Sequence, residues 1–159
     1  MIKIDIIPNI DTYQVTKNLR FAIIILLLSG CASTTQYVKF SSKDFNKETN
    51  AKIYVMRQTE FGFSIKMRIF QDEKLIGKLG PKSYLSWEVN PEDGDIIIIS
   101  KSENKDMLTI SPKKGKTYYI KQKVKMGWAF ARTGLEFLEE KEAIKILDDL
   151  KKPKMKYTE

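Results

Sequence analysis

From Ala51 onward, short apolar runs alternate with clusters of turn-forming residues. Ile65, Met67 and Ile69 occupy every second position, which places them on one face of a β-strand. Gln71-Asp72-Glu73-Lys74 then predicts a tight turn that leads into the returning strand of a hairpin. The pattern predicts strands over residues 52–57, 65–70, 75–79, 83–89, 95–100, 106–110 and 117–124. This spacing is typical of sandwiches, and we predict a mainly β fold: an antiparallel β-sandwich of about seven strands.

Two of these strands carry more specific expectations. Asp95-Ile96-Ile97-Ile98-Ile99-Ser100 is a continuous apolar run, which predicts a central strand buried on both faces. Tyr118 and Tyr119 are neighbours in the last strand and therefore point to opposite faces. We expect at most one of these two rings in the core and the other to be free for a partner.

The chain ends differently. Residues 139–152 contain neither Gly nor Pro. One apolar stripe at helical spacing is formed by Ala143, Ile144, Leu147 and Leu150, and Ile146 widens it. We predict one C-terminal amphipathic helix that packs on the sandwich and completes a domain of residues 51–152. Pro153 ends the helix, and residues 153–159 form a basic tail.

The N-terminal part contains a different signal. Lys17 and Arg20 precede the apolar run 21–28, which as a helix spans about 12 Å, far short of a ~30 Å hydrocarbon core. A basic flank, a short apolar core and small residues before a cleavage point form the layout of a secretory signal. The run ends in Leu28-Ser29-Gly30-Cys31, which resembles the lipobox of bacterial lipoprotein precursors.

The lipobox resemblance implies a specific processing. A diacylglycerol is attached to the sulfur of Cys31, the signal peptide 1–30 is cleaved off, and the new amino terminus is usually acylated. The alternative is that Cys31, which is the only cysteine, is a buried structural thiol. Residue Ala32 is not Asp, and in enterobacterial-type sorting this favours the outer membrane, at its periplasmic face, over the inner membrane.

Residues 31–50 are polar, and we interpret them as the lipidated N-terminus and a tether with room for one short strand. A flexible coil of about 19 residues spans about 25 Å on average. Such a tether lifts the folded domain clear of the lipid headgroups.

Composition narrows the chemistry. The chain has no histidine, and lipidation of Cys31 leaves no free thiol, which excludes Ser-His-Asp and Cys-His catalysis and most zinc sites. We expect no cofactor, no bound metal and no disulfide within the chain. A pair of carboxylates such as Glu88 or Glu92 could still serve an enzyme. The turn with Glu92, Asp93 and Asp95 lacks the pattern of a calcium loop, and we interpret it as a solvated turn.

The net charge of +8 suits an anionic partner. Because an exported protein meets little nucleic acid, anionic lipid, another envelope protein or a cell-wall polymer are the better candidates. The alternative is that lysines spread along the chain only keep the surface solvated and protect strand edges.

The segment Met126–Arg132 is the strongest candidate contact surface. It places Trp128 and Phe130 close to the cations Lys125 and Arg132, a mixture that suits a lipid interface or a sugar polymer. The alternative, which we favour from the sequence, is that this segment is a final strand or loop whose aromatic side chains fill the end of the core.

Several segments together resemble small bacterial lipoproteins with a β-sandwich domain of unknown function, related in type to carboxypeptidase-regulatory and transthyretin-like domains. The matching pieces are Ala51-Lys52-Ile53-Tyr54-Val55-Met56-Arg57, the hairpin 71–79, Ser83-Tyr84, Val89-Asn90-Pro91 and Gly115-Lys116-Thr117-Tyr118-Tyr119-Ile120. The resemblance implies a fold and an envelope location but no activity. We therefore expect an exported, lipid-anchored, non-enzymatic binding or scaffold module. The alternative is an enzyme or enzyme inhibitor that acts on cell-envelope polymers.

Overall fold

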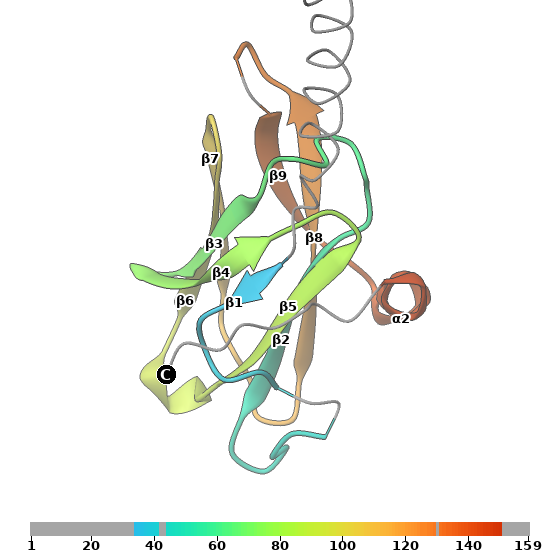
Figure 1. Ribbon diagram of the computed structural model, residues 1–159. Helices are drawn as coiled ribbons and strands as arrows, with labels where there is room; N and C mark the ends of the chain where they lie inside the picture. The colour runs from blue at the N-terminus through green and yellow to red at the C-terminus, as the bar shows by residue number, and fades with distance from the viewer. Residues whose placement is uncertain (1–33, 42–43, 130, 151–159) are drawn as a thin grey trace, which may run out of the picture. The chain divides into compact units, whose positions relative to one another are not determined.

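A computed structural model describes residues 34–41, 44–129 and 131–150 of the chain (Figure 1). All of them belong to the second of the two compact units into which the chain divides, residues 32–159. The predicted signal peptide with Leu28-Ser29-Gly30-Cys31, the residue Phe130 and the predicted basic tail lie outside the described residues. The elements are β1 Thr35–Gln36, β2 Ala51–Arg57, β3 Met67–Gln71, β4 Lys74–Leu79, β5 Ser83–Val89, the 3-10 helix η1 Pro91–Asp93, β6 Ile96–Lys101, β7 Lys105–Ile110, β8 Thr117–Met126, β9 Ala131–Phe137 and α2 Glu140–Asp149.

These strands form two sheets that pack face to face. One sheet has the order β1-β4-β3-β6-β7 and the other the order β5-β2-β8-β9 (Figure 1). Inward-facing aliphatic side chains from both sheets fill the space between them, and Trp87 closes this core with its indole N–H donating to Gln71 Oε1 at 2.8 Å. The prediction of a mainly β, two-sheet fold with one C-terminal helix is confirmed.

The pairing of β2 with β8 differs from the prediction. These two strands run parallel, with Lys52 opposite Thr117 and Val55 opposite Ile120. The prediction of an entirely antiparallel sandwich is therefore wrong at this pair. Alternation along each strand reports which face is buried, but it holds no information about which distant strand lies alongside.

One strand was not predicted as a separate element. It is β9, which pairs antiparallel with β8. The inner face of β9 contains Thr133, whose hydroxyl lies 2.5 Å from that of Ser100 in the opposite sheet. A buried polar pair of this kind hides the apolar alternation by which a strand is recognised.

The isoleucine run of β6 is buried on one face only. Ile96 and Ile98 lie in the core, but Ile97 is 39% exposed on the outer face. The expectation of burial on both faces is wrong because the helix packs on the other sheet (Figure 1).

Helix α2 builds a second, smaller core on the outer face of the four-stranded sheet. Ala143 and Ile146 pack there with Tyr54 and Met56 of β2. Tyr119 belongs to this cluster, and its ring stacks on that of Tyr54 at 5.5 Å between centroids, whereas Tyr118 packs against the core between the sheets. Both tyrosines are therefore packed, contrary to the expectation that one would be free, because the helix gives the sheet two covered faces.

Much of the predicted tether is part of the fold. Thr35 lies opposite Lys78 as β1 adds to the edge of β4. The carboxamide of the buried Gln36 donates to Ser86 O at 2.8 Å and accepts from Ser86 N at 3.3 Å, so it also joins the edge of β5. Residues 34–41 thus lie along the sheet edges, and β1 is the short strand for which the predicted tether left room. The short polar side chains that are typical of a linker satisfy edge-strand hydrogen bonds here.

Candidate functional site

Strand registers show which loops share an end of the sandwich. Thr35 lies opposite Lys78, which places the first described residues beside the end of β4. Arg57 lies opposite Ser83, Lys101 opposite Lys105, and Met126 opposite Ala131. Loops 58–66, 80–82 and 102–104 and the β8–β9 turn are therefore together at this end, which we call the proximal end (Figure 1). The opposite, distal end holds η1 and the turns before β2, after β3 and after β7.

The proximal end exposes a group of large apolar side chains, which we call the aromatic patch. Its members are Phe61 at 49%, Phe63 at 64%, Met126 at 79% and Trp128 at 96% relative exposure. Eight such side chains are exposed among the described residues, and the other four lie within β6, β7, β9 and α2. The distal loops that the structure describes contain none of them, so apolar exposure is concentrated at one end.

Trp128 corrects the expectation that its ring fills the core. Strands β8 and β9 continue to the register pair Met126 and Ala131, and the turn that joins them projects beyond the packed sheets (Figure 1). Trp128 lies in this turn at 96% exposure, so its side chain is in solvent. The basic neighbours Lys125 and Arg132 are exposed as well, opposite each other across the hairpin.

The loop that carries Phe61 and Phe63 is held in place by a buried arginine. Arg57 is fully buried, and its guanidinium donates to the carbonyl oxygens of Ile65 at 2.6 Å, Phe61 at 2.7 Å and Gly62 at 2.9 Å. Burial lowers the pKa of Arg57 to about 10. Three carbonyl groups compensate in part for the water that the cation loses, and in doing so they fix the course of the loop.

The same loop lies against the β8–β9 hairpin. A Cβ placed on Gly62, whose φ is 68°, would lie 3.6 Å from Val124 Cγ1 and 3.8 Å from the Cβ of Ala131. The loop that carries the two phenylalanines flanking Gly62 therefore lies beside the hairpin that carries Met126 and Trp128. The two phenylalanines were not among the predicted contact residues; the available signal was a Phe-Gly-Phe sequence inside an otherwise polar stretch.

Hydrogen bonds tie the Trp128 turn to the other sheet. The backbone N–H of Trp128 donates to Glu103 Oε1 at 3.1 Å, and Ser102 Oγ donates to Ala131 O at 2.6 Å. Asn104 forms a two-way pair with the backbone of Thr133, at 2.7 Å and 3.0 Å. The position of the tryptophan is thus set by contacts from both sheets.

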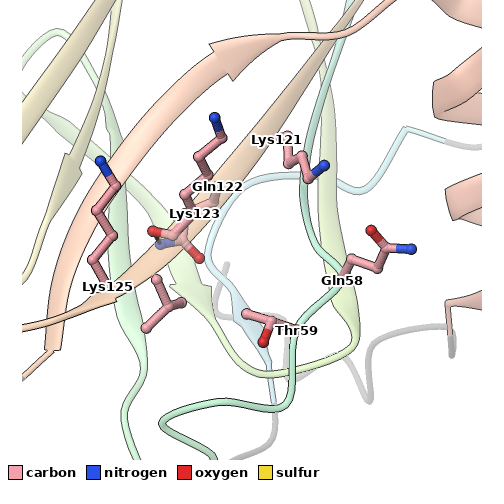
Figure 2. Close-up of a pocket in the computed structure, with 7 residues that line it drawn as sticks. Gln58, Thr59, Lys121, Gln122, Lys123 and Lys125 are labelled. Atoms are coloured by element: carbon pink, nitrogen blue, oxygen red, sulfur yellow. Dashed lines mark hydrogen bonds between the residues drawn. The ribbon is translucent and has the colours of Figure 1, made fainter.

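A shallow groove of about 330 Å³ runs beside this end, along β8 and the start of loop 58–66 (Figure 2). Figure 2 shows Lys121, Lys123 and Lys125, which occupy alternate positions of β8 and therefore share its outer face. Lys121 lies 3.9 Å from Glu136, which also pairs with Lys123. The row is cationic, with part of its charge balanced.

The carboxylates considered for an enzyme lie apart from this groove. Glu88 accepts hydrogen bonds from Asn50 Nδ2 at 2.6 Å and from Ser41 Oγ at 3.1 Å. Glu92 lies in η1 at the distal end and accepts from Lys114 Nζ at 2.9 Å; this hydrogen bond and the lysine charge lower the pKa of Glu92. Within the described residues no group of three potential metal ligands occurs, and no helix is both long and apolar enough to cross a bilayer.

Comparison with known proteins identifies a distant relative. The chain is 29% identical over 132 residues to an uncharacterized protein of Haemophilus influenzae, a match that covers 80% of this chain and 78% of the relative. No protein-family model matches the chain, and no solved structure matches it. The chain is thus distantly homologous to this Haemophilus protein, and it has a two-sheet β fold with one C-terminal helix.

Proposed function

We propose that this protein is an exported envelope lipoprotein, anchored through a lipid on Cys31, that acts as a non-enzymatic binding or scaffold module. The observation that carries the proposal is the sequence Leu28-Ser29-Gly30-Cys31 at the end of a short apolar run, with the only cysteine at the position a lipoprotein requires. The resemblance to small lipoproteins with a β-sandwich domain supports the same proposal.

The anchor is physically sufficient. Each buried methylene contributes about 0.8 kcal/mol, and one acyl chain alone gives only reversible binding. Two or three chains on one residue hold a domain of this size on the membrane permanently. Because Ala32 follows Cys31, the periplasmic face of the outer membrane is the proposed location.

A role without catalysis is supported by the inventory of side chains. The sequence has no histidine, and Glu88 and Glu92 each accept a hydrogen bond from a different side chain, Asn50 and Lys114. The exposed aromatic patch is the kind of surface by which a module contacts a partner. The proposed partners are the membrane, an envelope protein or an anionic envelope polymer.

Replacing Cys31 with alanine tests the proposal. Wild-type protein should incorporate labelled palmitate, lose the mass of residues 1–30 and fractionate with membranes. The Cys31→Ala variant should incorporate no label and should be found as unprocessed or soluble protein. Ser33→Ala, two residues further on, is the matched control and should behave as the wild type. If Cys31→Ala has the mass and the membrane partition of the wild type, the lipoprotein proposal is wrong.

A further inference from the structure

We propose that the aromatic patch is a membrane-docking surface: Phe61, Phe63, Met126 and Trp128 lie in the headgroup layer of the bilayer that holds the lipid on Cys31. This inference rests on the proposed lipidation and deepens it. It specifies which end of the sandwich faces the lipid and names phospholipid as the partner of the patch.

Only a short length of chain separates the proposed anchor from the fold. Consecutive Cα atoms are 3.80 Å apart, so the Cα of Cys31 lies at most about 11 Å from that of Thr34. The Thr34 hydroxyl accepts from Gly80 N at 2.9 Å and contacts the Ser83 hydroxyl, which places Thr34 at the proximal end. A seven-residue strand spans about 23 Å, so a lipid on Cys31 cannot reach past the distal end.

The aromatic patch lies at this same end. Ser83 is opposite Arg57 in the neighbouring strand, and the Arg57 guanidinium binds the carbonyl oxygens of Phe61 and Gly62. Gly62 in turn lies against the β8–β9 hairpin that carries Trp128. An unbroken series of contacts therefore joins Thr34 to the aromatic patch, and a bilayer within reach of Cys31 is also within reach of the patch.

The chemistry of the two ends fits a single orientation. Tryptophan and phenylalanine rings are favoured at the headgroup level of a bilayer, where an apolar body meets a wet surface. The cations Lys101 and Lys105, and Lys125 and Arg132, flank the two proximal turns in exposed positions and suit anionic headgroups. Of the acidic residues at this end, Glu60 pairs with Lys82 at 2.7 Å and Glu103 accepts from the Trp128 backbone.

The distal loops have the opposite character. They mix carboxylates with lysines and, within the described residues, expose no large apolar side chain; the carboxylates are Asp44, Glu48, Asp72, Glu73, Glu92, Asp93 and Asp95. An anionic membrane favours the proximal end over this one on both charge and apolar area.

The backbone that carries the patch is held before it meets the membrane. Arg57 holds the Phe61–Phe63 loop, and Ser102, Glu103 and Asn104 hold the Trp128 turn. Because the two loops need little further ordering on docking, a small apolar area is enough to orient a domain that the lipid already holds at the surface.

Tryptophan fluorescence of the full-length lipidated protein tests the inference. The protein is reconstituted into vesicles of phosphatidylglycerol and phosphatidylcholine brominated near the ester end of its acyl chains. We expect Trp128 to be quenched by bromine and to be shielded from acrylamide in the water. Trp87 is buried and should respond to neither reagent, so Trp128→Phe gives the baseline.

The matched control moves the reporter along the same strand. Phe137, at 52% exposure, is six residues after Ala131 in β9 and therefore about 20 Å from the patch. The double variant Trp128→Phe/Phe137→Trp should be quenched by acrylamide but not by the brominated lipid. Quenching of both reporters by lipid would mean that the domain lies on its side, and the end-on inference would be wrong.

The remaining outcomes separate the anchor from the docking. If the protein floats with the vesicles but acrylamide quenches Trp128, the docking inference is wrong and the lipid anchor is unaffected. If Trp128 is shielded from both reagents, the docking inference is wrong as well, and the patch instead contacts a second copy of the protein. Protein that neither carries lipid nor floats overturns the proposed function and this inference together.

Discussion

Gly77 lies in β4 at the point where β1 and Leu85 of the opposite sheet approach most closely. A Cβ at this position would lie 2.5 Å from the carbonyl oxygen of Thr35 and 2.9 Å from Leu85 Cδ2. The first of these is a backbone atom and cannot rotate away. Gly77→Ala therefore forces β1 off the edge of β4, and it tests whether the N-terminal segment is part of the fold.

The magnitude follows from the contacts. Overpacking of a core position costs about 1–3 kcal/mol. Displacing β1 also weakens the 2.8 Å hydrogen bond from Tyr37 N to Ile76 O and the hydrogen bonds between Gln36 and Ser86. Each of these hydrogen bonds contributes roughly 1 kcal/mol to stability. Alanine returns about 0.4–1 kcal/mol by restricting the unfolded chain. We expect a net loss of about 1–3 kcal/mol and a fall in Tm of about 4–12 °C.

Gly134→Ala is the matched control, because it also places a methyl group on a glycine within a strand. Its Cβ would lie 3.7 Å from the nearest atoms, an ordinary contact, so the variant should be as stable as the wild type or slightly more stable. Thermal and urea unfolding of the three proteins measure the difference, and trypsin should cut Gly77→Ala sooner at Lys39. If the Gly77 and Gly134 variants have equal stability, β1 does not pack on β4 as described.

Two further predictions concern the second core under the helix. Ile146→Ala removes a buried side chain and should lower the free energy of unfolding by about 2–5 kcal/mol. Ile144→Ala, at an exposed position, should change the free energy of unfolding little. Equal effects of the two substitutions would contradict the packing of α2. Burial raises the pKa of Tyr84 and Tyr119 above the usual value of about 10. Negative charge on Tyr54 adds to the shift of both, and Glu140 adds to that of Tyr119. In this pH range the folded state therefore keeps protons that the unfolded state loses. Stability present below about pH 10 should therefore be lost as the pH rises through that value, and Tm should fall more between about pH 9 and pH 11 in the wild type than in Tyr84→Phe/Tyr119→Phe.

The parts of the fold that local sequence determines were predictable. β5 has the predicted bounds Ser83–Val89, and the hairpin turn at Asp72, whose φ is 53°, joins β3 and β4. Both depend on alternation and turn chemistry within a few residues. The parallel pairing of β2 with β8 and the docking of Gln36 depend on partners far along the chain, which no local pattern specifies.

The candidate site, too, was predictable only in part. The mixture of aromatic and basic residues around Trp128 was visible in the sequence. The exposure of Trp128 was not, because the sequence alone does not distinguish a tryptophan in a core from one at a hairpin tip. Phe61 and Phe63 join the site only because Arg57 is buried beneath their loop. A buried cation bound by carbonyl groups leaves no periodic trace in a sequence.

The parallel pairing of β2 and β8 has a consequence for the order in which the chain folds. β2 is buried along its whole length, yet its two partners, β5 and β8, are both synthesised after it. Until Thr117–Met126 has emerged, one side of this apolar strand has no ladder to join. Contacts this distant close slowly, and an unpaired apolar strand is prone to aggregate. A chain that stops short of β8 therefore leaves one edge of β2 unpaired, and we expect the domain to acquire its structure late and as one cooperative unit.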